Sequence, residues 1–431
     1  MTTDAGPVAR RQVVSWGLWD WGSSAYTTIF LTFVFSVYVT DSVGADLPGS
    51  VSAQSWLGWA VGAAGLVVAL LAPVVGQSAD RGGYVLRSTA VWTVGTVVLT
   101  GLGFLVQDDW RYLWLGVLLL ALGSITFELA EVSYNALLSR VSTPSTIGRV
   151  SGFGWSMGYF GGIVLLLLVY VLFIAGESGP TAGALGVSTE NGLNIRVVAL
   201  VAAVWFTLSA IPLFLAVPET PPAEDRPARL GVAASYRKLF ADLRDLYRAS
   251  PHTVYFLGAS ALFRDGLAAV FTFGAVLAVS VYGIGADDVL IFGVAANVVS
   301  ALGALSGGWL DDRIGPKPVI VGSLIGMLVA GVILLFVSGP TAFWVFGLFL
   351  CLFVGPAQSS SRTFLGRLCP PGREGQLFGL YATTGRAVSF LAPTLFGVFA
   401  LISDRAGILG ILVVIAAGLL ALWRVRPPAR V

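Results

Sequence analysis

Seven charged side chains lie inside long apolar stretches of this sequence, where a charge is costly. They are Asp20, Glu128, Glu131, Arg264, Asp265, Arg362 and Arg386. An ionisable group at the centre of a lipid bilayer costs about 3 kcal/mol even on lenient insertion scales. We therefore expect each of these groups to face a polar cavity or an opposite charge, and some of them to bind a solute or a proton.

The three carboxylates nearest the N-terminus are candidates for proton coupling. Glu128 and Glu131 are three residues apart and so share one face of a helix. Two neighbouring carboxylates resist joint ionisation, so that one of them can keep a proton. The alternative is that both pair with arginines and hold helices together. Asp20 is the only charge in residues 13–40, and we expect it to couple protons or to form an ion pair at an inward-facing cavity.

The intramembrane arginines are candidates for binding a substrate. Arg386 is the best of them to hold an anionic group, because a guanidinium binds carboxylate or phosphate in a bidentate manner. A structural ion pair is the alternative for Arg386. Arg264 and Asp265 are adjacent and must point to different helix faces, so we expect Asp265 to line a central cavity and Arg264 to pair with another helix or a polar substrate end. Arg362 lies near the predicted inner membrane boundary, where an arginine can extend to the headgroups.

Uncharged polar groups add two weaker candidates. The stretch "FVGPAQSSSR" places Pro356 before four polar residues, and the proline kinks a helix and frees a backbone carbonyl. A run of four polar residues covers every helix face, so some of them must face protein or water. We expect Gln358 to line a cavity, and Asn297 is a similar candidate for substrate binding.

The composition identifies the kind of protein that must position these groups. The chain is 56% hydrophobic and only 11% charged, with a mean hydropathy of +0.85, whereas soluble domains are about a quarter charged. This is a polytopic membrane protein. Cys351 and Cys369 show no metal-ligand spacing, and the chain contains neither a phosphate-binding loop nor a nucleophile elbow. We therefore expect no enzyme activity, no cofactor, no metal and no nucleic-acid partner.

Twelve apolar runs are long enough to cross a bilayer, which needs about 20 residues of helix. They cover about 13–40, 52–76, 88–106, 111–138, 151–175, 195–217, 253–282, 288–308, 318–338, 341–365, 376–402 and 407–423. This pattern predicts an all-α membrane protein with two bundles of six helices each, residues 1–217 and 253–431.

The basic loops predict the orientation. If both termini are cytoplasmic, the cytoplasmic segments hold 19 Lys and Arg residues and the outer segments hold three. Cytoplasmic loops of membrane proteins carry such an excess, so we expect both termini to be cytoplasmic. Arginine outnumbers lysine 23 to 2 and no N-x-[ST] acceptor occurs, which favours a bacterial inner membrane.

The longest polar segment, residues 218–252, separates the two bundles. It opens as "PETPPAEDRP", a proline-rich stretch that cannot be helical. The stretch that follows places apolar residues on one helical face and basic residues on the other: Val232, Tyr236, Leu239, Phe240, Leu243, Leu246 and Tyr247 form the apolar face. Such a helix is typical of the inner membrane surface, with a solvated spacer as the alternative.

The two bundles repeat weakly. "GQSADRGG" follows the second span and "GGWLDDRIG" follows the eighth, with the same spacing from Gly76 to Asp80 as from Gly308 to Asp312. Arg81 and Arg313 follow these aspartates. Two six-helix halves in parallel repeat are the architecture of one large class of transporters, whose binding site lies between the halves.

These motifs resemble the major facilitator superfamily, whose loop after the second span reads G-x-x-x-D-R-x-G. The resemblance implies that Asp80, Arg81, Asp312 and Arg313 close the inner gate through ion pairs and a helix-end dipole. The stretches "WGLWDWGSSAY", "FELAEVSYNALL", "LFRDGLAAV" and "PAQSSSRTFLGRLCPPGREGQLFGLY" resemble one branch of that superfamily. That branch includes the vacuolar amino-acid effluxer of fungal autophagy.

The resemblance implies a secondary transporter that works by alternating access. We expect a small polar or zwitterionic substrate, amino acids first, with possible proton coupling, and the analogy favours export. The lipid bilayer is its other partner, and we expect a monomer. A multidrug or lipid-like exporter is one alternative, although it would need a more apolar cavity. A membrane scaffold or receptor is the other, although it would gain little from seven costly charges.

Overall fold

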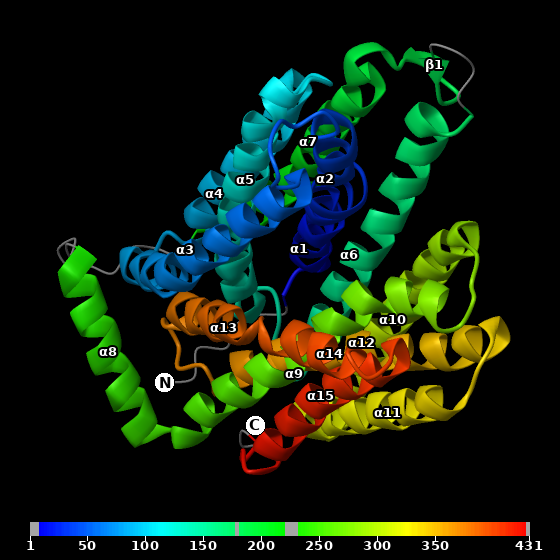
Figure 1. Cartoon of the computed structure of the whole chain (residues 1–431). Coiled ribbons are helices and arrows are strands. Elements are labelled where there is room, and N and C mark those ends of the chain that lie inside the picture. Colours follow the sequence, from blue (N-terminus) through cyan, green and yellow to red (C-terminus); the bar gives the residue numbers. More distant parts are fainter. Residues whose placement is uncertain (1–7, 177–180, 220–231, 428–431) are drawn as a thin grey trace.

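The computed structural model describes residues 8–176, 181–219 and 232–427, and nearly all of their regular structure is helical (Figure 1). The first half of the chain contains α1 (Arg10–Ser24), the π-helical segments η1 (Ala25–Phe33) and η2 (Tyr38–Val43) with α2 (Phe35–Val37) between them, α3 (Ala53–Gly82), α4 (Val85–Leu102), η3 (Gly103–Leu105), η4 (Trp110–Tyr112), α5 (Leu113–Ala136), η5 (Leu137–Ser139), α6 (Ile147–Val169), η6 (Tyr170–Ile174), β1 (Thr181–Ala182), β2 (Val187–Ser188), η7 (Glu190–Gly192) and α7 (Leu193–Ala216). β1 and β2 form a small antiparallel hairpin in which Thr181 pairs with Ser188.

The rest of the chain continues the helical pattern. It contains α8 (Val232–Ala249), α9 (Pro251–Ser280), α10 (Ala286–Ile314), α11 (Pro316–Phe336), α12 (Pro340–Leu368), α13 (Glu374–Val388), α14 (Leu391–Ala400), η8 (Asp404–Ala406) and α15 (Gly407–Trp423). Residues 220–231, the proline-rich part of the predicted linker, lie outside the described residues. The predicted amphipathic helix after them is α8.

Eleven helices of the described residues are long and apolar enough to cross a membrane. The eleventh predicted span, 376–402, is two shorter helices, α13 and α14, separated at Ser389 and Phe390. Pro393 explains the break, because its ring collides with the carbonyl four residues back and it has no N–H to donate. The fold is therefore the expected all-α membrane architecture, with its eleventh span broken near the middle.

The helices form two bundles, which we call the N-half (α1–α7) and the C-half (α9–α15). Figure 1 shows the N-half in blue to green and the C-half in green to red, with α3 beside α13 and α6 beside α10. These two pairs are the main seams between the halves. We call the end of the bundles at which α1 begins and α15 ends the inner end, after the predicted orientation, and the opposite end the outer end.

Glycines bring the seams into backbone contact at the inner end. Gly76 on α3 meets the carbonyl of Gly375, and Gly148 at the start of α6 meets the carbonyl of Gly308. Toward the outer end, a side chain added at Gly62 or Gly293 would meet nothing within 4 Å. The halves are therefore closed against each other at the inner end and separate toward the outer end.

A proline kink in α3 strengthens the first seam. Pro73 cannot donate to the carbonyl of Ala69, and the Thr383 hydroxyl of α13 donates to that oxygen instead, at 2.8 Å. The next carbonyl, that of Leu70, accepts a hydrogen bond of 2.7 Å from the Tyr236 hydroxyl of α8. The carbonyls of Ala69 and Leu70 thus accept hydrogen bonds from the other half and from the linker helix. Backbone polar groups buried in a bilayer need such partners, because no water is available there.

We predict that a bulky residue at Gly76 opens the inner end. In the Gly76→Leu variant the leucine side chain would collide with the Gly375 backbone, so the conformation with a closed inner end becomes less populated. The measurement is the alkylation rate of a cysteine placed at Ala72, which is fully buried in the same seam. We expect a rise on the order of tenfold, the equivalent of about 1.4 kcal/mol.

The Gly62→Leu variant is the matched control, since it adds the same side chain to the same helix at a position with open space. The background carries alanine in place of Cys351 and Cys369, the two native cysteines. Equal alkylation rates in the two leucine variants would contradict the close seam at Gly76.

Candidate functional site

The intramembrane charges are sorted by sign between the two halves. Three carboxylates belong to N-half helices, on α1 and α5, and three arginines belong to C-half helices, on α9, α12 and α13. They are Asp20, Glu128 and Glu131 on one side, and Arg264, Arg362 and Arg386 on the other. Where the halves meet, the two sets neutralise each other. The remaining member of the seven, Asp265, has a separate task that is described below.

Arg386 pairs with Glu128 across the two halves. Its Nε donates to Glu128 Oε2 at 2.9 Å, and its Nη2 forms an ion pair with Oε1. Arg386 lies 12 residues after the start of α13, roughly 18 Å from the inner end. At that depth the Arg386 side chain is still 36% exposed and that of Glu128 is 14% exposed. The pair is therefore reachable from outside the packed core while lying near the middle of the bundle.

Arg362 is the second arginine that joins the two halves, and it contacts three N-half helices, α1, α5 and α6. Its Nη1 lies 3.5 Å from Asp20 Oδ2 and donates to Asn135 Oδ1 at 3.0 Å. Its Nε and Nη2 donate to the hydroxyl and carbonyl oxygens of Ser151, at 2.9 and 2.7 Å. The Tyr134 hydroxyl donates to the same Asp20 oxygen at 2.8 Å. The prediction that Arg362 extends to the headgroups is wrong, since the residue is only 4% exposed.

Tryptophans enclose this second connection. The Arg362 guanidinium lies 4.7 Å from the Trp16 ring centre and 5.5 Å from that of Trp155. Trp16 is fully buried and stacks on Tyr134. The aromatic faces and the Asp20 carboxylate together offset the free-energy cost of removing the Arg362 guanidinium from water.

Glu131 lies one helical turn after Glu128 on α5. Its carboxylate is within electrostatic range of Asp20, Arg264 and Arg362. Arg362 thus lies near two carboxylates, Asp20 and Glu131, and Arg264 lies near Glu131 as well.

Arg264 and Asp265 point to different places, as their adjacency predicts. Arg264 lies 3.7 Å from the centre of the Tyr381 ring and donates to the Tyr381 carbonyl at 3.1 Å. Asp265 is buried, and its Oδ2 accepts from the N–H of Ala392 at 2.7 Å. That N–H belongs to the first turn of α14, so Asp265 caps the helix that begins after the break in the eleventh span.

The two uncharged candidates differ in what they contact. Gln358 Oε1 accepts from the Tyr159 hydroxyl at 2.5 Å, which joins α12 to α6 across the halves. Asn297 donates to the carbonyl of Gly293 on its own helix, at 2.8 Å. In this conformation Gln358 is thus part of the contact between the halves, and Asn297 is not.

At the inner end, two aspartates each cap a helix of the opposite half. Asp80, at the end of α3, accepts from the N–H groups of Gly375 and Gln376 at 2.8 Å each. Asp312, at the end of α10, accepts from the N–H groups of Gly148 and Arg149 at 2.7 and 3.1 Å. The free N–H groups of a helix start favour a negative charge, so each cap holds the inner end closed.

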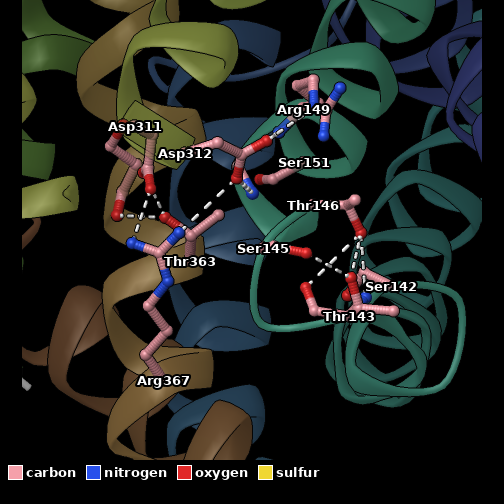
Figure 2. A network of polar contacts seen from close by, with 12 residues as sticks. Ser142, Thr143, Ser145, Thr146, Arg149, Ser151, Asp311, Asp312, Thr363 and Arg367 are labelled. Carbon is pink, nitrogen blue, oxygen red and sulfur yellow. Dashed lines mark hydrogen bonds and ion pairs between the residues drawn. The ribbon is translucent and has the colours of Figure 1, made fainter. Parts of the chain in front are cut away.

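Figure 2 shows the cap at Asp312 with its neighbours. Arg149 Nε also donates to Asp312 at 2.8 Å, and Arg367 reaches both Asp311, at 2.7 Å, and Asp312, at 3.6 Å. The Thr363 hydroxyl donates to Asp311 at 2.5 Å. The sequence patterns did not single out Arg149, Asp311 or Arg367. The double aspartate in "GGWLDDRIG" and the basic end of the tenth span were the available signals.

The two motif arginines do not bridge the halves. Arg313 is exposed and lies over the Trp309 ring of its own helix, at 3.6 Å from the ring centre. Arg81 keeps a buried Nη2 atom without a hydrogen-bond partner. Within the described residues, the hydrogen bonds between the halves at these two motifs come from Asp80 and Asp312 and not from the arginines that follow them.

We predict that Asp312 and Arg313 respond differently to alanine, although they are neighbours in one motif. Asp312→Ala removes the cap of α6 and should lower stability by about 1 kcal/mol, the usual loss for a helix cap. Thermal unfolding in detergent measures the loss, and the alkylation rate of a cysteine at Ala72 measures the opening. Arg313→Ala, the control, should leave both unchanged. If the two variants lost the same stability and opened to the same extent, Asp312 would not be the residue that keeps the inner end closed.

Comparisons with known proteins agree with this geometry. Residues 139–428 match the family model described as "Vacuole effluxer Atg22 like". The chain is 25% identical over 401 residues to the uncharacterized MFS-type transporter YxiO of Bacillus subtilis (strain 168), covering 92% of this chain and 90% of that protein. It is 25% identical over 282 residues to autophagy-related protein 22-1 of Aspergillus fumigatus, covering 60% of this chain but only 44% of the fungal protein.

Solved structures show the same fold. A major facilitator superfamily transporter, FucP, in the outward conformation superposes with a TM-score of 0.69 at 14% identity, covering 96% of this chain and 98% of that chain. The proton:xylose symporter XylE gives a TM-score of 0.71 at 14% identity, covering 96% and 93%. Since the family model covers well over half of its length, this chain belongs to the Atg22-like family of the major facilitator superfamily and is a secondary transporter.

Proposed function

We propose that this transporter moves a small zwitterionic metabolite, an amino acid before others, which binds by separating Glu128 from Arg386. The observation that carries the proposal is the pair itself. Its two members come from opposite halves, lie near the middle of the bundle and keep part of their surface exposed. A cation and an anion that face each other across a moving interface match a ligand that carries both charges.

Charge balance favours a zwitterion over a simple anion. If the halves rock apart, Glu128 and Arg386 lose each other as partners at a depth where an unpaired charge is costly. A substrate carboxylate can take the place of Glu128 on Arg386, and a substrate ammonium can take the place of Arg386 on Glu128. An anion would satisfy only the arginine and leave the glutamate unpaired.

The neighbouring groups fit the same ligand. The Arg264 guanidinium lies against the backbone of Gly385, next to Arg386, and a side chain added at Gly385 would meet it at 3.3 Å. Tyr381, one turn before, offers its ring to Arg264. We propose that Arg264 and Gln358 contact the substrate's polar end. Asp265 acts indirectly, because it caps the start of α14, which follows the helix that carries Arg386. Asn297 would contact a substrate that enters from the outer end.

Proton coupling is proposed for Asp20 and Glu131, together with Glu128. Asp20 bonds Arg362 across the inner half of the interface. A proton on Asp20 would remove that charge partner, so that the inner end opens more readily. Proton binding and inner opening are then linked, which is what coupling requires.

Orientation, direction and assembly complete the proposal. The basic loops favour cytoplasmic termini and a bacterial inner membrane. The family description "vacuole effluxer" favours export. A monomer suffices, because both halves of the site lie in one chain.

We predict that amino acids stabilise the purified protein and that each charge of the pair is needed. At a concentration of 100 times Kd, a ligand adds about 2.7 kcal/mol to the stability of the native state. A thermal-shift panel would contain amino acids, the amines that lack the carboxylate and the acids that lack the ammonium. Only the zwitterions should raise Tm, and Arg386→Gln and Glu128→Gln should both abolish the rise.

Arg405→Gln is the control, because Arg405 lies at the predicted outer end, where it donates to Ser338. This variant should respond like the parent. Stabilisation by the carboxylate-free amines to the same extent would contradict the zwitterion and favour a cationic or more apolar substrate.

We predict that Asp20→Asn separates transport from proton coupling. The amide keeps the size of the side chain and can still accept from Arg362 and Tyr134, so folding should survive. Counterflow of labelled substrate in vesicles should continue, whereas uptake driven by a pH gradient should fall on the order of tenfold. Full loss of counterflow in a folded protein would place Asp20 in the substrate site instead.

A further inference from the structure

The helix between the halves, α8, packs on the inner seam through one stripe of side chains. Leu239 is buried, and Leu243 and Leu246 are partly buried, at the spacing of one helix face. Asp242 lies in the same stripe and also faces the bundle. The carboxylate in this otherwise apolar stripe is the feature that the transport site does not explain.

Asp242 contacts both sides of the seam. Its Oδ2 accepts from Gln77 Nε2 of α3 at 2.9 Å and from Gln376 Nε2 of α13 at 3.3 Å. Its other oxygen lies 3.7 Å from Lys238 Nζ on the same helix. Gln376 is also the residue whose N–H is capped by Asp80. One carboxylate of the linker thus joins the two helices that must separate when the inner end opens.

A second contact sets the depth of α8. The Tyr236 hydroxyl donates to the carbonyl of Leu70, a residue whose own side chain is exposed on the outside of α3. Leu70 lies six residues before the predicted end of its span at residue 76, roughly 9 Å inside the boundary. Helices that lie in a bilayer surface sink their apolar face by about 5–10 Å, so this depth suits an interfacial helix.

The flank of α8 beside this stripe carries aromatic rings, and the side opposite to the stripe carries basic side chains. Phe240 is 68% exposed and Tyr247 is 48% exposed, and Tyr247 continues toward Tyr255 of α9 through a contact between their hydroxyls at 3.3 Å. Among the described charged residues of α8, the exposed ones are four bases, Arg237, Lys238, Arg244 and Arg248, and one acid, Asp245.

We propose that α8 is a strap that the anionic surface of the bilayer holds in place, and that Asp242 closes the strap over the α3–α13 seam. The apolar rings anchor it in the boundary region, and the basic side chains bind anionic headgroups. The occupant of its exposed side is the lipid surface. A bilayer rich in anionic lipid stabilises the closed inner end, and a neutral bilayer releases it. The effect is independent of the substrate.

The test compares the full chain in vesicles of phosphatidylcholine alone with vesicles in which a quarter of the lipid is phosphatidylglycerol. The readout is the alkylation rate of a cysteine at Ala72 in the seam, measured without substrate, so that failure of the zwitterion site does not affect it. We expect the parent to react severalfold more slowly with the anionic lipid. Asp242→Ala should react faster, on the order of tenfold, and at one rate in both vesicles.

Asp245→Ala is the matched control on the same helix and should behave like the parent. Asp242→Asn keeps the volume and one acceptor oxygen and covers the case in which the alanine variant does not fold. The triple variant Arg237→Gln, Arg244→Gln, Arg248→Gln spares Lys238 and should lose only the lipid dependence. If the parent protein reacts at the same rate in both vesicles, anionic lipid does not stabilise the closed inner end. If the Asp242→Ala variant still reacts more slowly with anionic lipid, Asp242 does not transmit the effect of the lipid to the seam.

Discussion

The high cost of an unpaired charge between the two bundles governs this structure. Apart from Asp265, the N-half carries carboxylates into the bilayer and the C-half carries arginines, and the ion pairs among the described members of these sets join the two halves. The bundles must therefore meet, or bind something charged, for either to be stable. Glu128 with Arg386 and Asp20 with Arg362 are the two places where this happens in the described conformation.

These ion pairs work together with the helix caps at the inner end. Asp80 and Asp312 each complete the open hydrogen bonds of a helix start in the other half, and the repeated motif makes the two caps near copies. Close glycine contacts allow the caps to reach. Separation of the halves at the inner end would therefore break backbone contacts, caps and one buried ion pair together.

The broken eleventh span and the linker helix adapt this general design. Pro393 ends α13 just after Arg386, and Asp265 caps the new start of α14. The end of α13 is thereby fixed where Arg386 must hold its position. On the outside of the same seam, α8 adds the contacts of Asp242 and Tyr236. The Glu128–Arg386 pair and the cap at Asp80 thus share one helix, α13.

The sequence by itself determined the membrane class, the spans, the two-bundle repeat and the identity of the costly charges, because hydropathy and local motifs depend on neighbouring residues only. It also predicted that Arg264 and Asp265 point apart. It could not choose among partners, since pairing joins residues as far apart as Glu128 and Arg386. Tertiary packing decided that Arg362 is buried rather than extended to the headgroups, that the arginines of the motifs do not bridge the halves, and that α8 lies over a seam. Such contacts follow from which helices meet at which depth, and no local pattern records that.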